Sequence, residues 1–357
     1  MNVSPVSRPL LSDRQWRWFR SVARATWLLC IGVVILGAYV RLSDAGLGCP
    51  DWPGCYGHVG VPQAAEEVAR ANAAFPERPV EIDKAWKEMI HRYFASGVGL
   101  GILVLLIMGW KAAPVSRGFL LGLFGLVCFQ GILGMWTVTW QLKPAVVTAH
   151  LLGGMTTLAL LTWLNVQVGR ARHMPGGHDD PSASTSAMDH GRSPASKGLR
   201  RFAVLAFVVL GMQVFLGGWT STNYAALACT DFPTCHQQWW PEADFDEAFV
   251  IWRGLGVNYE FGVLDSPART AIHLSHRIGF LVVTAVFLAL SVLLWRERRQ
   301  AWAVALLLAL AAQIVIGIST VLYSLPLWLA TAHNAGAAVL VMLMTALNAR
   351  LRMPHNG

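Results

Sequence analysis

Charged residues are scarce in this chain. Asp, Glu, Lys and Arg make up 13% of its 357 residues, whereas 55% are hydrophobic. A soluble domain carries roughly a quarter charged residues, so the composition excludes an ordinary soluble fold, and the mean hydropathy of +0.47 agrees. The net charge of +8 does not indicate nucleic-acid binding, because the basic residues flank apolar runs, which is how membrane topology is encoded. The sequence therefore predicts a membrane protein.

Long polar stretches are also few, and the apolar runs between them have membrane-spanning length. The runs cover 22–41, 90–110, 117–138, 145–168, 199–220, 271–294, 301–323 and 327–349. A helix of about 20 apolar residues crosses a bilayer, which predicts an all-α membrane protein with eight transmembrane helices. The first run follows several arginines and is not followed by a small-residue cleavage site, so we expect a retained span and not a signal peptide.

The charges divide the two sides of the predicted bundle. Acidic residues gather in two long loops, 42–87 and 221–268, and the other side carries basic residues that include Arg14, Arg17, Arg170, Lys197, Arg200, Arg296 and Arg350. Basic loops stay in the cytoplasm. We therefore expect a multi-pass protein of the bacterial inner membrane, with both termini cytoplasmic and both long loops periplasmic.

Cysteine is scarce as well. Four of the six cysteines form two short pairs in the long loops, Cys49/Cys55 and Cys229/Cys235. An oxidising compartment allows disulfides there, and each pair is either a structural staple or a reversible thiol pair. Cys30 and Cys128 fall inside spans, and we expect them to be small apolar core residues.

An internal repeat organises the chain. Segment 36–55 aligns with 216–235, and the later matches, at nearly constant separation, are His91-Arg92 with His276-Arg277, Gln130 with Gln313, and Thr148-Ala149-His150 with Thr331-Ala332-His333. Matched Cys, His, Arg and Gln in one order indicate a duplication. With an even number of helices per half, the halves are parallel repeats, which predicts two tandem four-helix bundles related by a pseudo-two-fold axis along the membrane normal.

The repeat sets the domain boundaries. We expect an N-terminal four-helix repeat over 1–168, a cytoplasmic linker over 169–198 and a C-terminal four-helix repeat over 199–357. The linker is rich in Gly, Ser, Pro and Asp, which is typical of a disordered segment. Its histidines, His173, His178 and His190, are either solvated or a metal site.

Four histidines lie within the spans, and ionisable residues there are functional candidates. His91, His150, His276 and His333 fall on the second and fourth helix of each half, at similar depth near the outer surface. A haem in a four-helix bundle takes one neutral imidazole from each side, whereas zinc needs three or four ligands. Each half is therefore predicted to hold one haem.

The repeats differ beside these histidines. Glu88 lies three residues before His91, whereas His273 lies three before His276, and this spacing puts each on its histidine's helix face. A carboxylate near a porphyrin can stabilise a developing cation or move a proton; a helix-start residue that faces solvent is the alternative. The sequence thus favours one reactive pocket and one electron-relay pocket.

Two arginines directly follow a predicted ligand. Arg92 and Arg277 are either snorkelling interfacial residues or partners for haem propionates, which suit the bidentate guanidinium. The first half also keeps Arg41 and Asp44, where the second half has Ser221 and Tyr224.

Several motifs resemble one known family. The stretch 37–55, the Glu88-x-x-His91-Arg92 run and the repeated Thr-Ala-His motifs are similar to haem A synthases, and the resemblance covers nearly the whole chain apart from the tails and linker. It implies oxidation of the C8 methyl of haem O to a formyl group by successive hydroxylations, for cytochrome oxidase assembly.

The resemblance also implies roles for individual residues. His91 and His150 would flank the substrate haem O, and His276 and His333 would ligate the iron of a haem b cofactor. Glu88 matches the family's essential acidic residue, and the Cys49–Cys55 pair matches a loop pair linked to redox during turnover. The implied partners are haem O, haem O synthase, an electron-transfer protein, membrane lipid and further copies of the chain.

Two other functions fit the residue pattern. A non-enzymatic di-haem b-type cytochrome would hold two equivalent haems and would not depend on Glu88. A haem carrier for oxidase assembly would bind haem and release it unchanged.

Overall fold

The computed structural model describes residues 12–110, 115–170 and 194–352. These ranges contain helices and no β-strand. Eight of the helices are long and apolar enough to span a membrane: α1 (Asp13–Leu42), α3 (Ile82–Gly109), α4 (Arg117–Thr139), α5 (Pro144–Arg170), α6 (Lys197–Thr222), α8 (Ser266–Arg296), α9 (Gln300–Leu322) and α10 (Leu327–Leu351). The predicted all-α protein with eight spanning helices is confirmed. Helices satisfy their own backbone groups, which a lipid environment demands.

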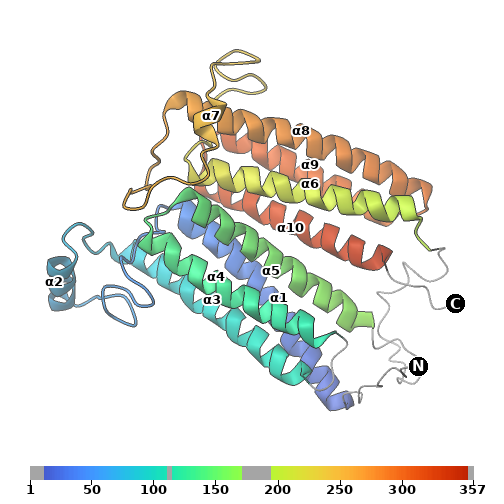
Figure 1. The fold of residues 1–357 in the computed structure, drawn as a ribbon, viewed down its shortest axis with the longest axis horizontal. Coiled ribbons are helices and arrows are strands. Elements are labelled where there is room, and N and C mark those ends of the chain that lie inside the picture. The colour runs from blue at the N-terminus through green and yellow to red at the C-terminus, as the bar shows by residue number, and fades with distance from the viewer. Residues whose placement is uncertain (1–11, 111–114, 171–193, 353–357) are drawn as a thin grey trace.

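The spanning helices form two four-helix bundles, which lie side by side in Figure 1. In the first bundle the neighbours around the ring are α1, α3, α4 and α5; in the second they are α6, α8, α9 and α10. Between the bundles, α1 packs on α10, α6 packs on α5, and α5 packs on α10. The first helix of each half thus contacts the fourth helix of the other, an arrangement consistent with the expected pseudo-two-fold axis.

A repeated hydrogen bond ties the first and fourth helices of each bundle together. Asn165 Nδ2 on α5 donates to Ala23 O on α1 at 3.2 Å, and Asn348 Nδ2 on α10 donates to Ala203 O on α6 at 3.1 Å. An amide side chain in an apolar bundle is stabilised by such a partner. The equal placement of the two asparagines shows that the duplication extends to side-chain contacts.

The helices extend beyond the apolar runs. The run 22–41 lies within α1, which begins at Asp13, where Ser12 and Gln15 form a capping box. Similarly, α8 begins at Ser266 behind Asp265, whose side chain accepts from Ala268 N. Hydropathy marks only the part of a helix that lies in lipid, whereas capping decides where the helix starts.

Both long loops lie at one end of the bundles, and the start of α1 and the end of α10 lie at the other (Figure 1). The loops contain two short helices that hydropathy did not predict, α2 (Ala65–Ala74) and α7 (Phe245–Ala248). Helix α2 is alanine-rich and begins where Glu67 accepts from Gln63 N and Ala64 N. Residues 171–193 of the predicted linker, with its three histidines, lie outside the described residues.

The two unpaired cysteines differ. Cys30 is buried, as predicted, but Cys128 on α4 is exposed, so the prediction that Cys128 is a core residue was wrong. A lipid-facing position and a core position have the same hydropathy, and only helix packing separates them.

Candidate functional site

The four predicted histidines lie on alternate spanning helices, in the first turns of each helix, at the end of the bundles where the long loops lie (Figure 1). His91 is on α3, His150 on α5, His276 on α8 and His333 on α10. The ring centroids of His276 and His333 are 6.5 Å apart, with planes at 78°. Two imidazoles on one iron have centroids roughly 6 Å apart, because each metal–nitrogen bond is about 2 Å long. The residues of the second half therefore fit a bis-histidine iron.

Each histidine ring packs against a glycine on a neighbouring helix. A Cβ on that glycine would approach the ring's Cε1 to 2.9 Å for Gly37 and His91, 3.5 Å for Gly134 and His150, 3.2 Å for Gly217 and His276, and 2.8 Å for Gly317 and His333. A side chain at these glycines would compete with the ring for space. The same support thus recurs four times, and the helix pairs are α1–α3, α4–α5, α6–α8 and α9–α10.

Several ring nitrogens lack partners. Nδ1 of His91, His150 and His333 is buried and has no hydrogen-bond partner. Buried polar atoms without partners are rare and call for an explanation, such as a bound ion or group. Within the described ranges no group of three or more His, Cys, Asp or Glu could hold a metal ion, so a zinc-type site has no candidate there. Paired imidazoles suit a haem iron instead.

Glu88 and His273 occupy equivalent places and make equivalent contacts. Oε2 of Glu88 accepts from Cys49 N at 2.8 Å, and Nδ1 of His273 accepts from Cys229 N at 3.2 Å. Glu88 is 5% exposed, which excludes the alternative that it faces solvent at a helix start. Each side chain joins its ligand helix to the first cysteine of its loop, and only the first half does so with a carboxylate.

The arginines after His91 and His276 bind the same loops. Arg92 donates to the carbonyl oxygens of Asp51, Pro53 and Gly54, and its Nη2 lies 2.5 Å from Glu88 Oε1.

Arg277 donates to the carbonyl oxygens of Thr234, Cys229 and Asp231 at 2.7–3.1 Å. The sequence did not predict this loop contact for either arginine, because it joins residues about 40 positions apart. A role in binding propionates stays a prediction.

The two cysteine loops have the same construction. Cys49 is bonded to Cys55, and Cys229 to Cys235. An aspartate inside each loop accepts backbone hydrogen bonds: Asp51 from Tyr56 N and Gly57 N, and Asp231 from His236 N and Gln237 N.

Asp231 has a further donor. The Thr234 hydroxyl lies 2.6 Å from Asp231 Oδ2, and this bond, with the two backbone bonds, lowers the pKa of the Asp231 carboxyl to about 2. The carboxylate form is the one that the loop's donors bind.

Residues that distinguish the two repeats meet between the bundles. Arg41 on α1 donates to Tyr224 OH at 3.1 Å and to Ser221 O at 2.9 Å, and its guanidinium lies 4.3 Å from the centroid of the Tyr224 ring. Asp44 lies 3.9 Å from the same guanidinium. Arg41 of the first half therefore contacts Ser221 and Tyr224, the repeat equivalents of positions 41 and 44, which is what a two-fold arrangement brings together at its axis.

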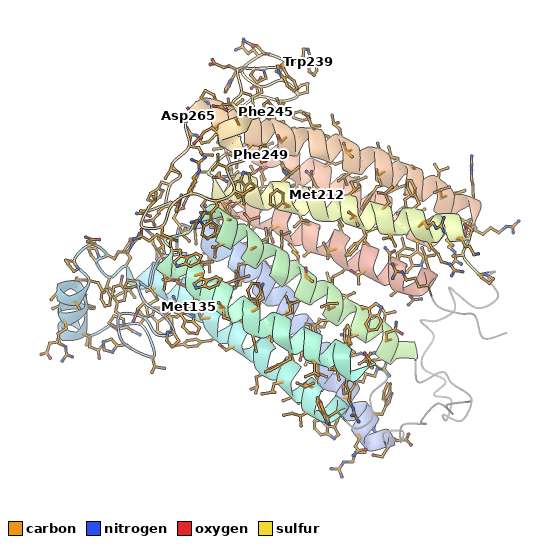
Figure 2. The ribbon with its side chains drawn as sticks, viewed as in Figure 1. Met135, Met212, Trp239, Phe245, Phe249 and Asp265 are labelled. Atoms are coloured by element: carbon orange, nitrogen blue, oxygen red, sulfur yellow. A yellow bond between two sulfur atoms is a disulfide. The ribbon has the colours of Figure 1, made fainter. Side chains whose placement is uncertain are left out.

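Residues 252–260 of the second long loop, here called the strap, contact the first half. Tyr259 N donates to Gln141 O at 3.1 Å, and Arg78 pairs with Glu260 at 2.8 Å. Buried Lys143 donates to Arg253 O and lies 3.5 Å above the Trp252 ring. Figure 2 shows the other part of this loop, with Trp239, projecting away from the bundles beyond the start of α8. The strap fixes the two halves to each other at the loop end.

The chain is similar to known proteins along most of its length. The model of the COX15-CtaA family, described as cytochrome oxidase assembly protein, matches residues 20–345. Heme A synthase of Shewanella oneidensis is 42% identical, with 90% of this chain and 95% of the relative covered. Heme A synthase of a Chelativorans species is 29% identical over 96% and 94% of the two chains. Heme A synthase COX15 of Mus musculus is 28% identical over 90% and 80%.

Proposed function

The chain belongs to the COX15-CtaA family of cytochrome oxidase assembly proteins, and on that premise we propose that it is a haem A synthase whose two halves hold two different haems. The enzyme oxidises the C8 methyl of haem O to a formyl group by successive hydroxylations. The first half, 1–168, binds haem O between His91 and His150. The second half, 199–357, binds haem b through His276 and His333, and residues 169–198 link the halves.

One observation carries the proposal. The His276 and His333 rings stand 6.5 Å apart with a glycine behind each, and a glycine stands behind each ring of the first half as well. When bound, haem b supplies one-electron redox chemistry. The neutral imidazoles of this chain orient it, and the packed α6, α8, α9 and α10 exclude water from it.

Glu88 is the residue that makes the first half reactive. It lies on the same face of α3 as His91, is buried, and keeps its carboxylate against Cys49 N and Arg92. A carboxylate held in this way stabilises positive charge that develops at the substrate's C8 methyl carbon, or takes a proton from it. His273 in the second half lacks the fixed negative charge, so that pocket relays electrons.

The two arginines could bind either the cysteine loops or a haem propionate. Arg92 and Arg277 bind carbonyls of the cysteine loops, and a propionate would compete for the same guanidinium hydrogens. A bound propionate would therefore couple haem occupancy to the cysteine loops.

The membrane orientation follows from charge. The described basic residues Arg14, Arg200, Arg296 and Arg350 lie at helix ends away from the long loops. This end is cytoplasmic by the positive-inside rule, and the loops are periplasmic in a bacterial inner membrane. Haem O synthase, as source of the substrate, and an electron-transfer protein are the partners that the reaction requires.

Mass analysis of extracted pigment tests the function. The chain is produced in cells that make haem O but have no other haem A synthase, and the haems are extracted and weighed. An enzyme yields haem A or its hydroxylated intermediate. A di-haem cytochrome yields haem b alone, and a carrier yields haem O unchanged; either result contradicts the proposal.

A further inference from the structure

Three of the four histidine-facing glycines have a glutamine one helical turn away. The pairs are Gln130 and Gly134 on α4, Gln213 and Gly217 on α6, and Gln313 and Gly317 on α9. A spacing of four puts both members on one helix face. Each glutamine therefore points to the same neighbouring helix as the glycine that supports the histidine ring.

The second half shows what these amides contact. Gln213 Nε2 donates to the backbone carbonyl of His276 at 3.0 Å and lies 3.1 Å from Nδ1 of its ring. Gln313 Nε2 donates to the backbone carbonyl of His333 at 2.9 Å and lies 3.4 Å from its ring Nε2. Each amide thus lies against both the backbone and the ring of the histidine it faces.

A second glycine makes room for each amide. Gly279 and Gly336 lie three residues after His276 and His333, and a Cβ on either would collide with the glutamine Oε1. Both Oε1 atoms are buried and have no hydrogen-bond partner. Each Oε1 is therefore a free hydrogen-bond acceptor, and a rotation of the amide about its last side-chain bond would turn it toward the facing histidine.

The first half repeats this arrangement for one histidine. Gly153 lies three residues after His150, and a Cβ there would collide with the amide of Gln130. The nearest amide atom is Gln130 Nε2, which is buried without a partner. The Gln130 site therefore differs from those of Gln213 and Gln313 in which amide atom faces the glycine, and the hydrogen-bond network assigns that orientation.

His91 has no such support. In the repeat alignment Val33 takes the place of Gln213, one turn from Gly37, and Phe94 takes the place of Gly279. The first half thus has no glutamine at this position, and the Cβ of Phe94 stands where Gly279 leaves room for the amide in the second half.

We propose that Gln213 and Gln313 are positioning residues for the histidines that hold haem b, with Gln130 serving His150, and that His91 is the displaceable ligand of the substrate pocket. The inference rests on the proposed function. When iron takes Nε2 of a neutral imidazole, the ring proton sits on Nδ1 and needs an acceptor. Rotation of the Gln213 amide brings its Oε1 to that place and gives up the present hydrogen bond from Nε2 to the His276 carbonyl. Gln313 lies nearer to Nε2 of its ring, so it positions His333 through the bond to the His333 backbone carbonyl. A pocket that must release its oxidised product benefits from one ligand without this hydrogen bond.

The test measures the midpoint potential of haem b in the purified full-length protein, and the rate of haem transfer to apomyoglobin. Gln213→Glu supplies a stronger acceptor, which favours ferric iron and lowers the potential. Gln213→Leu removes the acceptor, raises the potential and speeds haem loss about 10-fold or more, the usual range for such partners. Met212→Leu, on the neighbouring residue that is 58% exposed (Figure 2), leaves both quantities unchanged.

A purely structural role for Gln213 predicts something else. Both substitutions would then speed haem loss without shifting the potential in opposite directions, and that result overturns the proposal. If Gln213→Leu retains no haem, Gln213→Asn, whose shorter amide withdraws the acceptor, is compared with Gln213→Glu by the same criterion. Failure of the proposed function is separate, because the extracted pigment would then contain neither haem A nor its hydroxylated intermediate, whatever the potential of the Gln213 variants.

Discussion

The two halves of this protein share one frame and differ in what surrounds their histidines. In each half, two imidazoles pack against two glycines, and an arginine donates hydrogen bonds to the cysteine loop. The second half supports both histidines with a glutamine and places neutral His273 under its loop. The first half supports one histidine and places Glu88 there. On the proposed function, these differences correspond to one firmly held haem in the second half and one reactive, releasable haem in the first.

The largest effect is expected at the histidines of the second half, because the contrast between the two halves depends on His276 and His333 both binding haem. We expect His276→Ala or His333→Ala to abolish the low-spin haem b spectrum, because the proposed site would hold the haem iron through both imidazoles. His91→Ala is the matched variant of the first half and should retain that spectrum. Reduced-minus-oxidised spectra of the purified proteins measure this, and an unchanged spectrum in His276→Ala would reassign the ligands.

The Glu88–His273 difference predicts the next largest effect. Glu88→Gln keeps the hydrogen-bond acceptor for Cys49 N but removes the charge, and we expect haem A formation to fall about 10²-fold or more while haem content stays unchanged. His273→Gln, the equivalent change in the second half, should cost much less. Haem A is quantified by extraction and mass. Normal output from Glu88→Gln would remove its catalytic role.

The glutamine and glycine that His91 lacks can be introduced by substitution. Val33→Gln together with Phe94→Gly recreates the glutamine and glycine found beside His276. We expect the first half to release its haem about 10-fold more slowly, and turnover to fall because product leaves slowly. Haem transfer to apomyoglobin measures the release. The single variant Phe94→Gly, which makes room but adds no amide, is the control and should not slow release.

The contact between the halves should matter for stability more than for chemistry. Arg41→Met removes hydrogen bonds to Tyr224 OH and Ser221 O, and bonds to a charged donor contribute about 1.5–3 kcal/mol each in buried places. We expect a loss of several degrees in thermal stability in detergent. Tyr224→Phe, which removes one bond and keeps the ring under the guanidinium, should lose less. An equal loss of thermal stability in both variants would mean that the bond to Tyr224 OH accounts for the whole effect and the bond to Ser221 O for none of it.

The smallest expected effect concerns acid and the second loop. Because the native pKa of Asp231 is lowered to about 2, its contribution to loop stability is present above the ordinary aspartate pKa. It is lost as the pH falls from about 4 through 2. Phosphine reduction of Cys229–Cys235 should therefore accelerate only below about pH 4. In Asp231→Asn the rate should be high and show no such dependence, and a wild-type rate that rises already at pH 6 would contradict this assignment.

Part of the site was predictable because the chain is duplicated. Matched histidines, cysteines and arginines, and the Glu88–His273 difference, can be compared within one sequence without any structure. Gln130 and Gln313 were visible as a matched pair of the repeat, but their partners were not, and Gln213, whose repeat equivalent is Val33, did not stand out. Gln213 contacts His276 across 63 positions, and only the packing of α6 on α8 makes that contact possible.

By itself the sequence determined the number of spans, the repeat and the residue types available for chemistry, since lipid admits only long apolar helices and penalises every polar group within them. Tertiary structure decided which of those groups meet. Cys128 faces outward although Cys30 is buried, Arg92 binds its loop, and Arg41 crosses to the other half. Such choices depend on how helices rotate and pack against one another, which apolar periodicity does not encode when both the lipid side and the core side of a helix are apolar.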